Sequence, residues 1–291
     1  MKKRFHTLLV SIQEENLTEQ ERFWYRRMLQ TLRAVDVFVV DITEKKVVYE
    51  TGVAAIALVD TEEAKERIRA LHLPVVYYSH QCIGGYGADM LLMSFAEIGY
   101  DFFQQIFDRF HGQPWTILET RRCVLREAVL SDLDTFYEIY AQPSVARFME
   151  PLSDNYQEEQ DKLASYIKNQ YPFYGFGTWT VLAADYHCLD EDGSAPQQSS
   201  DSIIGRAGLN INEKTGNIQL GYVIREEYQG QGIATEVCQA ILNYARKELE
   251  LSRIELEVDP DNVKSLKLAK KLGFLPVETG SMCCIFNKDL L

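Results

Sequence analysis

The run Gln229-Gly230-Gln231-Gly232-Ile233-Ala234 restricts the fold of this chain more than any other stretch of its sequence. An apolar, strand-like run at 218–224 precedes it, and apolar side chains at helical spacing follow it from 233 to 244. Glycines let the backbone adopt positive φ and approach a ligand closely. The first amides of a helix have no intrahelical acceptor, and with the helix dipole they attract anions. The run therefore predicts a turn that binds a phosphate-bearing ligand.

Size and charge limit the choice of ligand. With 291 residues, of which 46% are hydrophobic, the chain is long enough for two domains with cores of their own. Its formal net charge is −13, whereas a protein that binds a nucleic-acid backbone needs a basic surface. We therefore expect no nucleic-acid partner, but a small anion held by backbone amides remains compatible with this charge.

Cysteine, histidine and hydropathy patterns exclude further classes of protein. The six cysteines form no C-x-x-C pair, which is typical of reduced thiols in a cytoplasmic protein. The five histidines lack H-x-x-x-H spacing, so we expect no metal site. The apolar run Leu8-Leu9-Val10 is too short for a signal sequence, and no apolar run reaches the length of a membrane span. The sequence thus predicts a cytoplasmic protein, monomeric or homodimeric, with no membrane partner.

The first part of the chain alternates strand and helix signals. Unbroken apolar runs predict strands covered on both faces at 37–40, 54–59, 74–78 and 90–93. Helices are expected from Thr61 to about 71, from 96 to 110, and within 11–35, the last with an apolar face of Phe23, Trp24, Leu29 and Leu32. The pattern predicts a small three-layer α/β domain with a mostly parallel sheet over residues 1–113.

The second part, residues 118–291, is expected to form another domain. Strands are predicted at 123–128, 178–183, 203–209, 218–224 and 253–259, and helices near 132–140, 157–170, 232–249 and 262–273, with two short strands at the end. The polar stretch 187–202 is typical of a solvated hairpin loop. In 253–259 the apolar residues alternate strictly, which leaves Glu255 and Glu257 on the opposite face.

Four motifs in order resemble the GCN5-related N-acetyltransferases (GNAT). The run 229–234 has the Q/R-x-x-G-x-G/A form, Leu220-Gly221-Tyr222 precedes it, and Asp261-Asn262-Val263-Lys264-Ser265 with Lys271-Leu272-Gly273-Phe274 completes an N-x-x-S…K-x-G-F signature. The opening at 125–134 resembles the branch of ribosomal-protein N-terminal acetyltransferases. The resemblance spans about 118–291 and implies a GNAT fold, that is, an α+β domain with a mixed, splayed sheet.

The resemblance also implies a cosubstrate, acetyl-CoA. Its pyrophosphate would lie on amides of the loop after Gln229, and its pantetheine arm would pair with the backbone of the preceding strand. Asn262 would bind that arm or simply cap the last helix. The implied loop residues are Gly230, Gln231, Gly232, Ile233, Ala234 and Thr235, and the strand residues are Tyr222, Val223 and Ile224.

Relatives transfer the acetyl group directly to a primary amine, either a protein N-terminus or a small molecule. The amine must lose a proton, and the leaving thiolate must be stabilised or protonated. The tyrosine that many relatives use for the thiolate is replaced by Ala269, so Ser265 is the implied substitute. The carboxylate that many relatives place before L/I-G-Y is replaced by Gln219, so Glu255 and Glu257 are the next candidates for the base, alongside a water relay or a purely structural role.

Three other features have weaker functional interpretations. Asp41-Ile42-Thr43-Glu44 faintly resembles a haloacid-dehalogenase motif, but it lacks the D-x-D-x-T/V pattern, so phosphatase activity is not predicted. The glycine-rich run 83–87 favours a loop over a phosphate cradle, because no helix follows it at once. The aromatic run 171–176 fits either core packing or part of an acceptor site.

Two other functions remain open at this point. Gln219 and Ala269 are compatible with a non-catalytic acyl-CoA-binding protein that has a regulatory N-terminal domain. The N-terminal domain could also carry a small-molecule site of its own at the carboxyl ends of its strands. The fold class alone does not decide between them.

Overall fold

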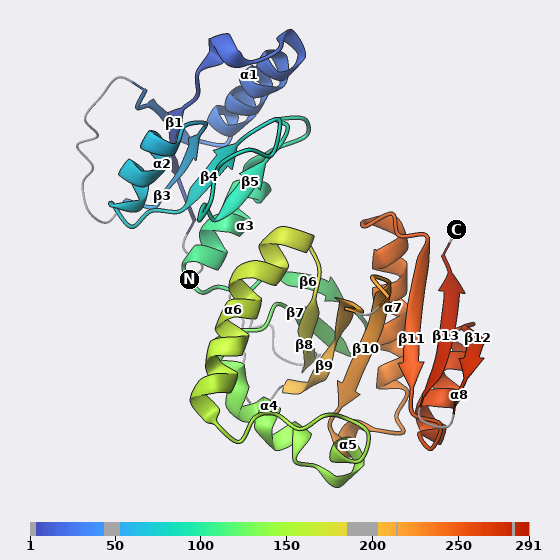
Figure 1. The fold of residues 1–291 in the computed structure, drawn as a ribbon. Coiled ribbons are helices and arrows are strands. Elements are labelled where there is room, and N and C mark those ends of the chain that lie inside the picture. The colour runs from blue at the N-terminus through green and yellow to red at the C-terminus, as the bar shows by residue number, and fades with distance from the viewer. Residues whose placement is uncertain (1–3, 44–52, 185–202, 214, 281–282, 291) are drawn as a thin grey trace. The chain divides into compact units, whose positions relative to one another are not determined.

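The structure is a computed structural model, and it describes residues 4–43, 53–184, 203–213, 215–280 and 283–290. The chain divides into two compact units, Met1–Trp115 and Thr116–Leu291 (Figure 1). The predicted hairpin loop at 187–202 and Cys188 lie outside the described residues. No helix in the described ranges is long and apolar enough to cross a membrane.

The N-terminal unit is built on a five-stranded sheet, and every pairing in it is parallel. The strand order is β2-β1-β3-β4-β5. The strands are β1 (Thr7–Ser11), β2 (Phe38–Asp41), β3 (Ala55–Val59), β4 (Val75–Tyr78) and β5 (Met90–Leu92). This confirms the expected α/β class, but the sequence analysis missed β1, which pairs with both β2 and β3 and is buried along its whole length.

Helices cover both faces of this sheet. Apolar side chains of α1 (Glu19–Ala34) and α3 (Tyr100–Phe110) pack on one face, and those of α2 (Glu62–Arg69) pack on the other. The prediction that Phe23 belongs to the buried face of α1 was wrong, because Tyr25 and Met28 fill the core while Phe23 is 59% exposed. Helix α3 begins later than expected because Glu97 has φ of 61° and Gly99, the N-cap, is extended.

The C-terminal unit contains an eight-stranded sheet (Figure 1). It is mixed, as the sequence resemblance implied. Its order is β12-β13-β11-β10-β9-β8-β7-β6, and β10 with β11 is the parallel pair within it. The strands are β6 (Thr116–Glu119), β7 (Cys123–Arg126), β8 (Thr178–Ala183), β9 (Ile203–Ile211), β10 (Ile218–Ile224), β11 (Arg253–Val258), β12 (Leu275–Thr279) and β13 (Cys284–Asp289). Strand β6 was not anticipated.

Two hydrophobic clusters hold helices on this sheet. The larger cluster joins α7 (Ile233–Lys247) and α8 (Val263–Lys271) to one face, where Ile254, Leu256 and Val258 of β11 also lie. The smaller cluster contains Leu133, Phe136 and Ile139 of α4 (Leu133–Tyr140), Val145 of α5 (Pro143–Ala146) and Leu163 of α6 (Tyr156–Tyr174). The alternation of β11 therefore turns Glu255 and Glu257 away from α7, as expected.

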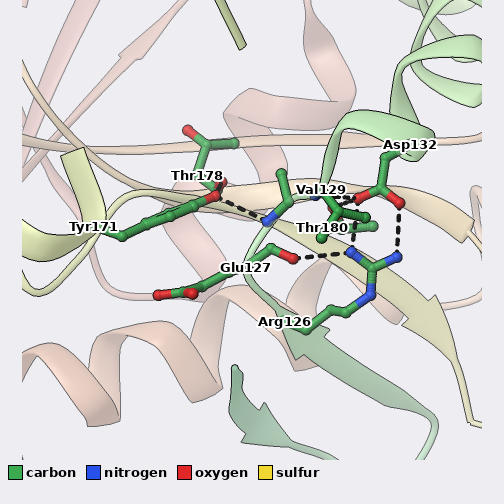
Figure 2. Close-up of polar contacts among 8 residues, drawn as sticks. Arg126, Glu127, Val129, Asp132, Tyr171, Thr178 and Thr180 are labelled. Atoms are coloured by element: carbon green, nitrogen blue, oxygen red, sulfur yellow. Dashed lines mark hydrogen bonds and ion pairs between the residues drawn. The ribbon is translucent and has the colours of Figure 1, made fainter. Parts of the chain in front are cut away.

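A buried polar network fixes the start of this unit (Figure 2). Arg126 donates two hydrogen bonds of 2.7 Å to the carboxylate of Asp132, which also accepts one of 2.8 Å from Thr180. The hydroxyl of Tyr171 donates to the carbonyl of Thr178 at 2.6 Å. A buried ion pair needs this degree of satisfaction to offset its desolvation. The network joins β7, β8 and the turn into α4, and it makes Tyr171 a core residue.

Candidate active site

Strands β10 and β11 diverge along their length. Only Gln219 and Glu255 are in register between them, whereas β10 pairs with β9 from Ile218 to Ile224. The edge of β10 that faces β11 is thus open beyond Gln219 among the described residues. This is the splay that the sequence resemblance implied, and it leaves backbone groups of Tyr222, Val223 and Ile224 without a β11 partner.

The glycine-rich loop leads from β10 into α7 through the short 3-10 turn Glu226–Tyr228. Gly230 has φ of 75° and Gly232, the N-cap of α7, has φ of 80°. A side chain in either conformation would be strained. No side chain caps α7, and the first helical bond runs from Glu236 N to Gly232 O at 3.1 Å. The backbone N–H groups just before Glu236 therefore point out of the helix end, where an anion can accept hydrogen bonds from them.

Gln229 holds this loop in place. Its side-chain amide donates to the carbonyl of Ile224 at 2.9 Å and to Ser144 Oγ at 3.0 Å, and its oxygen accepts from Lys264 Nζ at 3.0 Å. One side chain thus joins the end of β10, helix α5 and helix α8. The sequence motif indicated Gln229 as a loop residue, but it gave no sign of these three partners.

A cavity of about 660 Å³ opens between the end of β10, the loop, α5 and α8. It is lined by these residues from the sequence-derived set: Tyr222, Val223, Ile224, Gln229, Gly230, Gly232, Ile233, Ala234, Thr235, Asn262 and Ser265. Gln231 is the one residue of that cosubstrate set that does not line it. Helix α5 and the residues after it add Ser144, Val145, Arg147, Phe148 and Met149, a wall that the motifs did not indicate.

The cavity wall is basic although the protein is acidic. Arg147, Lys264, Lys267 and Lys271 line it together with a single carboxylate, Asp261. On α8 the three lysines recur at helical spacing on the side facing the cavity, while Lys270 lies outside the lining. Together with the loop amides, these cations give the cavity an affinity for multiply charged anions.

Two hydroxyl groups meet inside the cavity. Tyr222 Oη donates to Ser265 Oγ at 2.8 Å, and Ser265 N in turn donates to Asn262 Oδ1 at 3.1 Å. Asn262 is therefore the N-cap of α8, as one of its two interpretations required. Burial raises the pKa of Tyr222 well above its usual range, so the phenol stays protonated. Ala269, one helical turn after Ser265, is fully buried in the core.

The two candidate bases differ in their surroundings, and neither lines the cavity. Both carboxylate oxygens of Glu255 accept side-chain amides, from Asn212 at 3.1 Å and from Asn217 at 2.9 Å, and the residue is 4% exposed. Glu257 is exposed and has a long contact of 3.5 Å with Gln219 Nε2. Glu255 is thus bound into the turn between β9 and β10, whereas Glu257 can reach solvent.

The structure also locates the aromatic run 171–176 and the side chains that could bind a metal ion. In the aromatic run, Tyr171 and Phe176 are buried and Phe173 is 78% exposed, and none of the three lines the cavity. The described residues contain no group of three or more His, Cys, Asp or Glu side chains suited to a metal ion.

Comparison with known proteins places this geometry in a family. The acetyltransferase (GNAT) domain matches residues 122–275. The uncharacterized N-acetyltransferase p20 of Bacillus licheniformis is 28% identical over 163 residues, which cover 54% of this chain and 81% of that protein. The spermidine N(1)-acetyltransferase of Escherichia coli is 34% identical over 73 residues, or 24% of this chain and 39% of that enzyme.

Among solved structures, an acetyltransferase from Agrobacterium tumefaciens aligns over 60% of this chain and 95% of its own, with 20% identity and a TM-score of 0.47. The GNAT match spans more than half of the 291 residues. The chain therefore belongs to the GNAT family of acetyltransferases and is an N-acetyltransferase.

Proposed function

We propose that residues 118–291 transfer an acetyl group from acetyl-CoA directly to the nitrogen of a primary amine. The observation that carries the proposal is the cavity itself. It combines strand backbone at Tyr222–Ile224 that has no β11 partner, outward amides at the start of α7 and the Tyr222–Ser265 hydroxyl pair.

The donor fits the cavity in three sections. The pyrophosphate would lie on amides between Gly230 and Thr235, and the lysines of α8 would add attraction to the phosphates. The amide groups of pantetheine would bind the open edge of β10. The thioester would then lie near Ser265 and Tyr222, at the inner end of the same strand.

The reaction is an addition followed by an elimination. The lone pair of the neutral amine attacks the thioester carbonyl carbon, and a backbone amide of β10 stabilises the oxyanion that forms. The C–S bond then breaks, the sulfur takes the hydroxyl proton of Ser265, and water returns a proton to Ser265. Because Tyr222 donates to Ser265 Oγ, the one hydroxyl proton of Ser265 remains available for the sulfur.

The amine must also lose a proton, and we assign that step to Glu257 acting through water. Gln219 occupies the position nearest the splay but cannot accept a proton in this role. Glu255 has both oxygens engaged by amides, so we assign it to holding the turn between β9 and β10. A Glu257→Gln variant should lower kcat, while Glu255→Gln should mainly reduce stability.

The acceptor we propose is a cationic amine, either a peptide N-terminus or a small molecule. The net charge of −13 favours the approach of a cation, and one similar protein is named for acetylating spermidine. The motif at 125–134, which resembles the ribosomal-protein branch, favours a peptide N-terminus. An assay of thiol release with polyamines and with peptides distinguishes the two acceptor types.

The experiment tests donor binding and transfer to the acceptor separately. Isothermal titration with acetyl-CoA should give one binding site per chain, and release of free thiol should follow on addition of an acceptor from a panel of polyamines and peptides. Absence of binding at millimolar acetyl-CoA would overturn the donor assignment. Tight binding without thiol release across the whole panel would overturn the assignment of the acceptor class.

A further inference from the structure

Arg122 connects the turn between β6 and β7 to the glycine-rich loop, although 114 residues separate it from its main partner, Glu236. Its backbone N–H donates to Glu236 Oε1 at 2.9 Å, and its Nε donates to Glu236 Oε2 at 2.8 Å. Its NH1 group donates to the carbonyl of Gln231 at 2.9 Å. The mechanism above uses none of these contacts.

Glu236 has an electrostatic conflict with the anion site. It lies in the first turn of α7, the turn whose amides face the cavity. A carboxylate there interacts favourably with the helix dipole, but it also competes with a phosphate for the same positive potential. Burial by itself would raise the pKa of Glu236, but hydrogen bonds from Arg122 and Thr120 outweigh it and lower the pKa, so the carboxylate is ionised.

Arg122 removes this conflict in two ways. Its guanidinium compensates the carboxylate charge at 2.8 Å, and its contacts draw Glu236 toward the β6–β7 turn. Its NH1 also fixes the carbonyl between the two glycines, so the peptide that precedes Gly232 keeps one orientation. The side chains of Arg122 and Glu236 are 41% and 20% exposed, so salt screens the pair only in part.

We propose that Arg122 is a positioning residue for the phosphates of the donor. It compensates the negative charge of Glu236 and keeps the amides of 230–235 aimed at the cavity. This inference rests on acetyl-CoA being the donor. It assigns to Arg122 an effect on donors that carry the pyrophosphate and none on donors that lack it. A purely structural role would weaken both kinds of donor alike.

The test compares two donors in four proteins. Acetyl-CoA and acetyl-pantetheine, which lacks the phosphates, are assayed with wild type, Arg122→Ala, Arg121→Ala and the double variant Arg122→Ala/Glu236→Gln. Arg121 is the matched control, because it is the exposed arginine that directly precedes Arg122, whereas the hydrogen bonds to Glu236 and Gln231 come from Arg122. Circular dichroism and thermal melts verify that each variant is folded.

We expect Arg122→Ala to raise KM for acetyl-CoA about 10-fold, the effect of losing one charged hydrogen-bonded pair, with kcat and the KM for acetyl-pantetheine unchanged. Arg121→Ala should match wild type. Removing the Glu236 charge in the double variant should restore about half of the loss on a logarithmic scale, since the carboxylate no longer opposes the phosphates.

Three results would overturn the inference. These are an unchanged KM for acetyl-CoA in Arg122→Ala, an equal loss with both donors, and a double variant no better than the single one. If Arg122→Ala does not fold, Glu236→Gln alone gives the decision, because it should bind acetyl-CoA at least as well as wild type. Failure of wild type to bind acetyl-CoA is a separate outcome, which contradicts the proposed function.

Discussion

The chain contains two glycine-rich loops, and they use their backbone amides differently. In the N-terminal unit, Gly84, Gly85 and Gly87 all have positive φ, like Gly230 and Gly232 in the C-terminal unit. The N–H of Gly85 donates to Glu62 Oε1 at 2.6 Å, and Lys65 Nζ donates to the carbonyl of Tyr86 at 2.6 Å. The loop at 83–87 thus contacts side chains of α2, whereas the loop at 229–234 faces a cavity.

This difference explains why a glycine-rich run alone is weak evidence for a ligand site. At 83–87 a carboxylate of the protein occupies the place that a ligand phosphate would take, and the buried Lys65 pairs with that carboxylate. At 229–234 a helix of 15 residues follows the loop, and no side chain caps it. Free amides at a helix start, more than glycine itself, make an anion site.

The largest predicted effect comes from closing the second loop. Gly232→Val places a β-branched side chain at φ of 80°, so the backbone at the start of α7 must shift. We expect acetyl-CoA affinity to fall about 100-fold by isothermal titration. Gly216→Val is the control, because Gly216 has φ of 72° but lies in the turn before β10 with no atom within 4 Å of the added Cβ. Equal affinities for the two variants would contradict the assignment.

The next effect concerns turnover. Ser265→Ala removes the proposed proton donor to sulfur, so kcat should fall about 100-fold while KM for acetyl-CoA changes little. Tyr222→Phe should cause a smaller loss, because Ser265 keeps its proton but loses its orienting partner. Since burial raises the pKa of Tyr222, its phenol should cause no loss of kcat between pH 6 and 9. Steady-state kinetics over that range decide the matter, and a Ser265→Ala enzyme with normal kcat would exclude the role.

A smaller effect is expected at the cationic wall. Lys267→Ala should weaken acetyl-CoA binding about 3-fold at low salt and less at high salt, as expected for one exposed charge. Lys270→Ala, on the same helix but outside the cavity, should have no effect. Isothermal titrations with acetyl-CoA at two salt concentrations test this. Equal losses of affinity in Lys267→Ala and Lys270→Ala would contradict a specific contribution of the cavity wall.

A change at the loop 83–87 should leave the binding of acetyl-CoA unaffected. Glu62→Gln removes a charged acceptor for Gly85 and a partner of the buried Lys65. The pKa of Glu62 is lowered by hydrogen bonds from Lys65 and Gly85, so its contribution to stability is present at neutral pH and is lost as the pH falls through the lowered value. At pH values above this lowered pKa, the melting temperature of Glu62→Gln should lie a few degrees below that of wild type. A changed affinity for acetyl-CoA would contradict the separation of the two loops.

The C-terminal fold and cavity could be predicted from sequence because their motifs are local. The loop, its strand and its helix lie within residues 218–247, and periodicity defines each of them. The contacts that complete the site are long-range. Tyr222 reaches Ser265 across 43 residues, and Arg122 reaches Glu236 across 114, so no spacing rule reveals either pair.

The errors in the N-terminal unit have the same physical origin. Strand β1 is only five residues long, and its central position is set by pairing with β2 and β3, which the local sequence does not encode. Phe23 has the hydrophobicity of a core residue, but the face of α1 that packs on the sheet carries Tyr25 and Met28 instead. Tertiary packing decided both cases.

Backbone amide NMR during a titration with acetyl-CoA tests the contrast between the two loops most directly. If the account is correct, the amide resonances of residues 230–235 and of Tyr222–Ile224 shift in proportion to occupancy, while those of Gly84, Gly85 and Gly87 stay unchanged. Unchanged amides at 230–235 in the presence of saturating acetyl-CoA, or shifts confined to the loop at 83–87, would contradict it.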